Sequence, residues 1–190
     1  ALLAAEMQRR GPGTPPKFAV NLETNISPNT NGKWEQLSNG NALWRLSIYS
    51  KGAKSLNLGF TKYNMPRGGS LIIYSPDQEK IMGPFTPADN EEHEQLWTPI
   101  LDGDELVVEV QVPAAYKDHL ELELKYVNHD FMGFMQLASG SCNLDVICGE
   151  NDGWEIVEAY RDIIQSVAAI STGGSAFCTG FLVNNARQDC

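Results

Sequence analysis

The feature that most constrains this chain is an alternation of apolar and polar residues that recurs between Phe18 and Val127. It is clearest over residues 105–112, where leucine or valine alternates with glutamate, valine or glutamine. A side-chain period of two is typical of a β-strand with one buried face. Similar short runs predict further strands at residues 18–22, 44–48, 56–60, 71–74, 81–85, 96–100 and 120–126.

Turn-forming Gly, Pro, Asn and Asp separate these runs, and no long helical period interrupts them. Because each strand has one apolar face, each sheet must be covered by another. We therefore predict an all-β fold for residues 18–128: an antiparallel two-sheet β-sandwich of roughly seven or eight strands, jelly-roll-like or immunoglobulin-like in outline. The side chains predicted to face inward include Phe18, Val20, Leu22, Trp44, Leu46 and Ile48, whereas Leu43, Arg45, Ser47 and Tyr49 are predicted to face outward.

The residues before and after this region have a different character. Residues 1–5 form a short, alanine-rich stretch, which we interpret as a signal-peptide remnant or an expression scar. Residues 10–17 are rich in glycine and proline, which do not support regular structure, so residues 1–17 are predicted to be a flexible leader. Residues 129–139 are predicted to be a second linker.

The C-terminal region, residues 140–190, predicts a hairpin. Two β-prone runs, 167–170 and 177–183, flank the turn-forming residues 171–175. Upstream, apolar residues at helical spacing predict a short amphipathic helix or an irregular segment: Trp154, Ile156, Val157, Tyr160, Ile163 and Ile164.

Several motifs in this region resemble the start of the catalytic domain of bacterial secreted lysyl-endopeptidase-like proteases, which are trypsin-like serine proteases of the chymotrypsin fold. These motifs are Gly140-Ser-Cys-Asn-Leu-Asp-Val-Ile-Cys148, Arg161-Asp-Ile-Ile-Gln-Ser-Val167 and Cys178-Thr-Gly-Phe-Leu-Val-Asn-Asn185. Motifs in the sandwich region are similar to the pro-region of the same proteases: residues 42–46, 55–60, 63–66, 83–86, 89–90 and 95–99.

The resemblance implies where catalytic residues would lie. A serine protease needs a nucleophilic Ser, a His base and a carboxylate that orients the His. In this family the His belongs to a Thr-Ala-x-His-Cys motif after Leu-Val-Asn-Asn, and the Ser to Gly-Asp-Ser-Gly-Gly. Neither motif occurs before Cys190. Residues 140–190 are therefore predicted to be a truncated start of the protease domain, and no catalytic residue is assigned. This chain alone is expected to be inactive. Residues 173–176 are interpreted as a tight turn and not as a nucleophile motif.

The four cysteines, Cys142, Cys148, Cys178 and Cys190, all lie in the C-terminal region and contain no Cys-x-x-Cys pair. They predict a secreted protein that carries disulfides, extracellular or periplasmic. By resemblance, Cys142, Cys148 and Cys178 form disulfides in the parent protease with cysteines further along the chain, and Cys190 matches only some relatives. Within this chain the thiols would be free, mispaired or bonded to a second chain.

Other candidate sites carry weaker signals. The net charge of −10 argues against nucleic acid as a partner, and no apolar run approaches the roughly 20 residues of a membrane span. No cofactor is predicted, and the three histidines, His93, His119 and His129, are interpreted as solvated loop residues. Weak candidates are a Ca²⁺ site at Asp89, Glu91, Glu92 and Glu94, with Asp102 and Asp104 nearby in sequence, and sugar stacking at Trp34 and Trp97.

Two functions from different classes follow. In the first, the sandwich is the pro-domain of a secreted serine endopeptidase precursor that cleaves after Lys. The sandwich then assists folding of the catalytic domain or inhibits it. Its partner is the rest of the catalytic domain, within the same chain. In the alternative, the sandwich is a module that stays on the protease and binds carbohydrate or a cell surface.

Overall fold

The computed structural model describes residues 1–190 except 13, 135–154, 165, 173 and 182–190. The chain divides into two compact units, which are described separately: Val20–Phe131, and Ala1–Ala19 with the described residues of Met132–Cys190. The elements of the first unit are β1 (Ala19–Ile26), β2 (Lys33–Gln36), β3 (Asn41–Tyr49), β4 (Ser55–Asn64), β5 (Ser70–Tyr74), β6 (Ile81–Phe85), the 3₁₀ helix η1 (Pro87–Asp89), β7 (Leu96–Trp97), β8 (Leu101–Asp102), β9 (Glu105–Pro113), the 3₁₀ helix η2 (Ala114–His119) and β10 (Glu121–Asp130).

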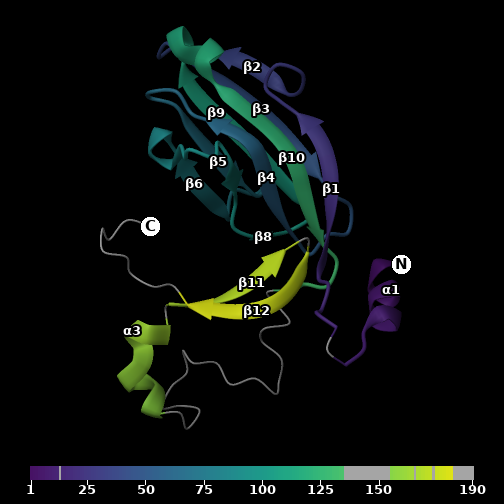
Figure 1. Cartoon of the computed structure of the whole chain (residues 1–190). Coiled ribbons are helices and arrows are strands. Elements are labelled where there is room, and N and C mark those ends of the chain that lie inside the picture. Colours follow the sequence, from purple (N-terminus) through teal and green to yellow (C-terminus); the bar gives the residue numbers. More distant parts are fainter. Residues whose placement is uncertain (13, 135–154, 165, 173, 182–190) are drawn as a thin grey trace. The chain divides into compact units, whose positions relative to one another are not determined.

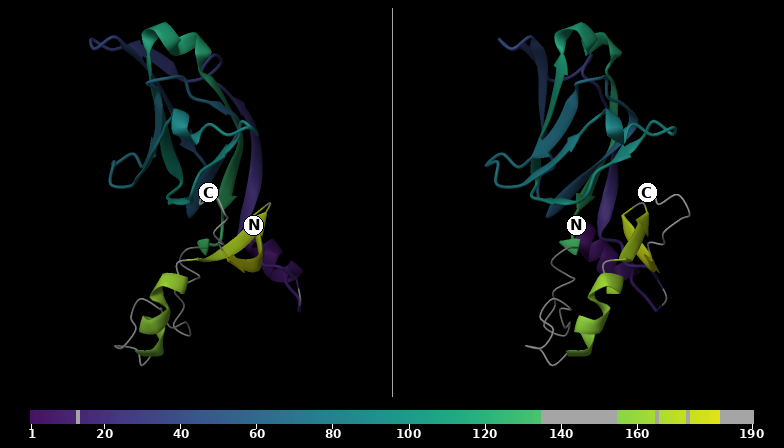
Figure 2. Two further views of the ribbon diagram at one scale, coloured as in Figure 1. Left: turned by 60° about the vertical axis from the view of Figure 1, so that its left-hand side comes forward. Right: turned by 90° about the vertical axis from the view of Figure 1, so that its left-hand side faces the viewer.

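The first unit is a sandwich of two sheets, which confirms the predicted fold class (Figures 1 and 2). One sheet has the order β1-β10-β4-β7, with β8 also paired to β4, and the other has the order β2-β3-β9-β5-β6. Strands from the two ends of the unit therefore lie side by side in both sheets: β1 beside β10, and β3 beside β9. This interleaving is that of a jelly roll, whose two Greek keys form two facing sheets.

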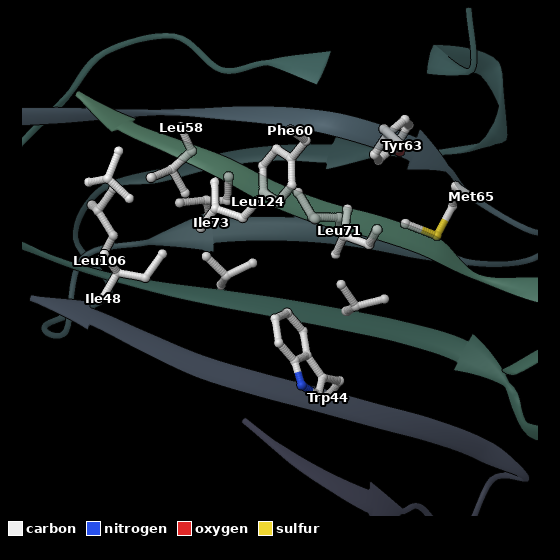
Figure 3. Close-up of a cluster of buried hydrophobic side chains, with 14 of the residues drawn as sticks. Trp44, Ile48, Leu58, Phe60, Tyr63, Met65, Leu71, Ile73, Leu106 and Leu124 are labelled. Atoms are coloured by element: carbon white, nitrogen blue, oxygen red, sulfur yellow. The ribbon is translucent and has the colours of Figure 1, made fainter. Parts of the chain in front are cut away.

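The core lies between the two sheets, and the alternation of the central strands explains it. On β9, every second residue from Leu106 to Val112 is buried, as the sequence predicts. In the register of β3 with β9, Trp44 lies opposite Val110 and Ile48 opposite Leu106, so the inward residues of neighbouring strands meet. Figure 3 shows the resulting cluster, to which β3, β4, β5, β9 and β10 all contribute.

Three predictions about this unit were wrong. His129, interpreted as a solvated loop residue, lies on strand β10 and is partly buried. Leu22 on β1 is 42% exposed, although it was predicted to face the core; β1 is the edge strand of its sheet and pairs with β10. Leu43 was predicted to face outward but is buried. It lies on a strand with neighbours on both sides, opposite Glu35 on β2 and Gln111 on β9, and cross-strand neighbours of this size cover such a position.

The second unit contains an N-terminal arm, defined here as residues 1–19, and a hairpin. The arm begins with helix α1 (Leu2–Arg9), which the sequence did not predict. The 3₁₀ helix η4 (Glu155–Tyr160) and α3 (Arg161–Ile164) occupy the predicted helical segment, but Ile156, Tyr160 and Ile163 are exposed. Strands β11 (Val167–Thr172) and β12 (Ser175–Phe181) form the predicted antiparallel hairpin, and the described residues form no closed barrel.

Candidate functional site

The turn of the hairpin is the first part of the candidate site. Thr172 pairs with Ser175, so only two residues connect β11 to β12. Gly174 has a φ of +78°, a left-handed conformation that glycine adopts without steric cost. The turn predicted at residues 171–175 is therefore confirmed, and its geometry depends on a glycine.

The N-terminal arm contacts this turn directly. The backbone N–H groups of Phe18 and Ala19 both donate to the Gly174 carbonyl, at 2.7 and 3.1 Å, and Lys17 forms a β-bridge with Ser175. A Cβ added at Gly174 would lie 2.1 Å from the carbonyl oxygen of Ala19. Because that separation is far below van der Waals contact, only glycine at position 174 allows the arm to approach.

A buried carboxylate fixes the path of the arm. Glu6 on α1 is only 5% exposed. Its carboxylate accepts hydrogen bonds from the guanidinium of Arg9 at 2.7 and 2.9 Å and from the backbone N–H of Lys17 at 2.9 Å. The hydrogen bonds from Arg9, and then the one from Lys17, hold the pKa of Glu6 below its ordinary value. Residues 1–17, predicted to be a flexible leader, thus contain a helix whose carboxylate bonds the other end of the arm.

An aromatic contact joins the arm to the segment that follows β10. The rings of Phe18 and Phe134 have centroids 4.4 Å apart at an interplanar angle of 31°. Aromatic pairs at such separations contribute beyond their buried area. The arm is therefore anchored by hydrogen bonds at the hairpin turn and by ring packing beside it.

The two tryptophans proposed for sugar stacking do not share a surface. Trp34 lies on β2 and Trp97 on β7, which belong to different sheets. The indole N–H of Trp34 donates to the Pro28 carbonyl at 2.9 Å, and the Lys117 ammonium lies 4.4 Å from the centre of its ring. A single two-tryptophan platform is thus not formed.

Trp97 instead pairs with Tyr126, a residue that the sequence did not single out. The two rings are stacked, with centroids 5.7 Å apart and planes 13° apart, and Trp97 is 48% exposed. In the sheet register, both Tyr126 and Trp97 lie opposite Gly59 on β4, and a Cβ at Gly59 would lie 2.5 Å from the indole. A glycine inside a strand signals such a close approach, which is how the sequence could have indicated this site.

The histidines do not form a catalytic triad within the described part of the chain. His129 is hydrogen-bonded through Nδ1 to the Ser50 hydroxyl at 2.8 Å, and His93 accepts the backbone N–H of Gln95 at 3.0 Å. His119 packs edge-on against Tyr116. These contacts are with a hydroxyl, a backbone N–H and a tyrosine ring, and none of them is with the carboxylate that orients the histidine of a triad.

The acidic loop does not assemble the weak Ca²⁺ candidate. Asp89 caps η1, where its carboxylate accepts the backbone N–H of Thr86 at 2.6 Å. Glu91, Glu92 and Glu94 are exposed. Across the residues that the structure describes, no three His, Cys, Asp or Glu side chains are placed to share a metal ion. Asp102, also near this loop in sequence, pairs with Lys80 at 3.3 Å.

The cysteine predictions lie largely beyond the described residues. Cys178 is on β12, in register with Ile170. Cys142, Cys148 and Cys190 fall outside the described part of the chain. The disulfides implied by resemblance stay predictions.

Fold and contacts define the class first: an all-β chain in which a two-sheet β-sandwich is followed by a β-hairpin. Residues 2–131 match the lysyl endopeptidase N-terminal domain family, and residues 137–190 match the lysyl endopeptidase C-terminal domain family. The chain therefore belongs to the lysyl endopeptidase N-terminal domain family. It is similar to the lysyl endopeptidase of Pseudomonas aeruginosa, with 28% identity over an alignment of 197 residues. The alignment covers 93% of this chain and 41% of the relative.

The chain spans less than half the length of that relative. No solved structure matches the chain significantly. In the described part of the chain, no helix has the length and apolar character that crossing a membrane requires.

Proposed function

We propose that this chain is the N-terminal part of a secreted bacterial serine endopeptidase precursor, and that its sandwich is a pro-domain that assists folding of the catalytic domain. One observation carries the proposal. The arm lies within the part that matches the N-terminal domain family, and its backbone N–H groups bond to the turn of a hairpin within the part that matches the C-terminal domain family.

The physical need for such assistance follows from the two folds. The sandwich has its own core, and its described buried side-chain polar atoms all have hydrogen-bond partners. A lone two-stranded hairpin is at best marginally stable and presents unpaired strand edges. Barrels built from non-local strand pairs fold slowly, because the loop-closure entropy must be lost before the contacts form. An N-terminal domain that folds first and contacts the first hairpin would lower this cost.

In the parent protein, the activity would be hydrolysis of peptide bonds after lysine, by a serine nucleophile with a histidine base. That specificity is what the name of the Pseudomonas relative states for that protein. No residue of this chain is assigned to catalysis. Cys142, Cys148, Cys178 and Cys190 would form disulfides in an extracellular or periplasmic parent.

Refolding in cis tests the pro-domain function. The denatured precursor is refolded with residues 1–131 in the same chain and, separately, without them, and cleavage of a lysyl amide substrate is followed with time. We expect a faster or higher recovery of activity with residues 1–131 present. If recovery is unchanged, the folding role fails; if the folded precursor gains activity only when residues 1–131 are cut away, the domain acts as an inhibitor instead.

A second candidate function is carried by the pair of Trp97 and Tyr126. A half-exposed indole stacked on a tyrosine offers a flat aromatic surface of the kind that sugar rings contact. A retained carbohydrate-binding module would bind insoluble polysaccharide with no protease present, and Trp97→Ala would abolish that binding. The matched substitution Trp34→Ala would leave it unchanged, because Trp34 lies in the other sheet.

A further inference from the structure

The contact between the arm and the hairpin turn suggests how the proposed pro-domain is regulated. We propose that the N-terminal arm is a clamp on the turn of the first catalytic hairpin, and that it engages the turn only while the linker between the two is intact. This inference rests on the proposed function, because the hairpin matters here as the start of the catalytic domain. Cleavage of the linker is then the event that releases the hairpin.

The clamp recognises backbone and not side chains. Its two donors are the N–H groups of Phe18 and Ala19, and its target is the Gly174 carbonyl. The arm can bind a turn only if the residue at the position of Gly174 presents its carbonyl and has no Cβ. A Cβ there would lie 2.1 Å from the carbonyl oxygen of Ala19. The partner that fits the arm is therefore a two-residue hairpin turn with glycine in the left-handed conformation.

The arm itself is held in the conformation that presents these donors. The Glu6 carboxylate bonds the backbone N–H of Lys17, one residue before the first donor. Arg9 closes the same loop from the other side, because its guanidinium bonds both Glu6 and the Pro15 carbonyl. Fixing these residues in advance reduces the entropy that is lost when the turn binds.

The number of contacts makes the clamp weak. Between the arm and the turn it consists of two hydrogen bonds to one carbonyl and a single β-bridge. Contacts of this number correspond to a dissociation constant of roughly millimolar or weaker. Such a contact forms for part of the time when both partners belong to one chain, because a tether gives an effective concentration of at most roughly millimolar. At micromolar concentration, separated partners would not stay bound.

The sandwich brings the two ends of its own segment of chain together. Strand β1 starts and strand β10 ends at the same end of the sandwich, so the chain leaves the domain where it entered it (Figure 1). The arm leads into β1 at Ala19, and the hairpin lies downstream of β10. A single cut after β10 therefore converts an intramolecular contact into an intermolecular one.

Hydrogen exchange in the full chain tests the clamp. A recognition site for a site-specific protease is inserted between Phe134 and Met135, and exchange of the Phe18 and Ala19 amides is measured at micromolar concentration before and after cutting. We expect both amides to be protected in the uncut chain. After the cut they should exchange up to about twofold faster, because the contact is formed for at most about half of the time before the cut and almost never after it.

A matched pair of variants separates the clamp from general destabilisation. Gly174→Asn keeps a residue that tolerates positive φ but adds the clashing Cβ, and it should accelerate exchange at Phe18 and Ala19 as much as the cut does. Gly52→Asn is the control: its φ is +80°, close to the +78° of Gly174, but nothing lies within 4 Å of an added Cβ. In this control both amides should stay protected.

The possible outcomes distinguish this inference from the function on which it rests. Fast exchange at Phe18 and Ala19 in the uncut wild-type chain, or protection that survives both the cut and Gly174→Asn, would overturn the clamp. Neither result decides the refolding assay, which compares recovery of activity with and without residues 1–131 in the same chain. In the converse outcome, exchange changes as the clamp predicts while residues 1–131 do not improve refolding. That result would support the contact and would show that the pro-domain function is wrong.

Discussion

The Glu6 carboxylate accepts a hydrogen bond from the backbone N–H of Lys17 at 2.9 Å, across the proline- and glycine-rich part of the arm. Arg9 and this N–H lower the pKa of Glu6 below its ordinary value of 4.5. A carboxylate with a lowered pKa in the folded state contributes stability that is present above the unfolded pKa. This contribution is lost as the pH falls through the folded pKa. The arm should therefore stay in place at neutral pH and loosen only below pH 4.5.

An NMR titration of the Lys17 amide measures this directly. Its chemical shift should change with a midpoint below 4.5, and the change should disappear in Glu6→Gln, which has no charge to titrate. A midpoint at or above that value would mean that Arg9 and Lys17 do not stabilise the carboxylate. Arg10 also faces Glu6 electrostatically, so Arg10→Ala should raise the midpoint less than Arg9→Ala does, because Arg9 donates directly.

Gly59 is the position on which the stack of Trp97 and Tyr126 depends. In Gly59→Ala, the added methyl group would lie 2.5 Å from the indole and displace it. We expect a loss of about 0.5–1.5 kcal/mol, the contribution of an aromatic pair beyond its buried area. Urea denaturation measures the free energy of unfolding, and the tryptophan fluorescence should change as the indole swings away.

A double-mutant cycle identifies the cause of that loss. When Trp97→Ala is already present, Gly59→Ala should cost close to nothing, because no indole remains to displace. Equal costs in both backgrounds would show that Gly59 is required for the strand itself. The same comparison bears on the second candidate function, since Gly59→Ala should also weaken any binding that needs the flat pair.

The central strands of the sandwich could be predicted from the sequence because both of their edges are paired and one face is always covered. On β9 the alternation and the burial coincide from Leu106 to Val112. The edge strands could not be predicted in this way. Leu22 continues an alternating run, yet what covers an edge strand depends on residues distant in sequence, and here Leu22 faces solvent. Strand β2, with the sequence Lys-Trp-Glu-Gln, carries too little apolar pattern to be found at all.

The candidate site could be predicted only in part, for a related reason. A two-residue turn at Gly174 follows from the local sequence. That Phe18 and Ala19 bond to this turn does not, because the contact joins backbone groups separated by most of the chain and leaves no trace in side-chain pattern. Only the spacing of Glu6 and Arg9, three residues apart on a helix, hinted that the leader was ordered.

Two leucines with opposite environments test the assignment of core and edge. Leu58 on β4 is fully buried, and Leu58→Ala should lower the free energy of unfolding by about 2–5 kcal/mol, since it removes buried methyl groups and leaves a cavity. The same substitution at Leu22 on β1 should cost less than about 0.5 kcal/mol, as at other exposed positions. Chemical denaturation of both variants gives the comparison. A cost at Leu22 equal to that at Leu58 would place the edge strand in the core, as the alternation predicted.

Asn90 anchors the acidic loop to the end of β4. Its amide bonds Met65 twice: the oxygen accepts the backbone N–H at 2.8 Å, and the nitrogen donates to the carbonyl at 3.0 Å. Asn90→Ala leaves both Met65 groups without these partners and should cost about 1–3 kcal/mol. Asn90→Asp should cost more at neutral pH, because a carboxylate oxygen would then face the Met65 carbonyl where a donor is needed.

Denaturation at neutral and acidic pH checks this pair of Asn90 variants. Protonation restores a donor in Asn90→Asp, so its stability relative to Asn90→Ala should rise as the pH falls through the pKa of the new carboxyl. Asn29→Ala is the control, since Asn29 is exposed and makes no side-chain hydrogen bond among the described residues, and its cost should stay within about 0.5 kcal/mol. If Asn90→Ala costs no more than this control, the acidic loop is held by Asp89 and its cap on η1 alone.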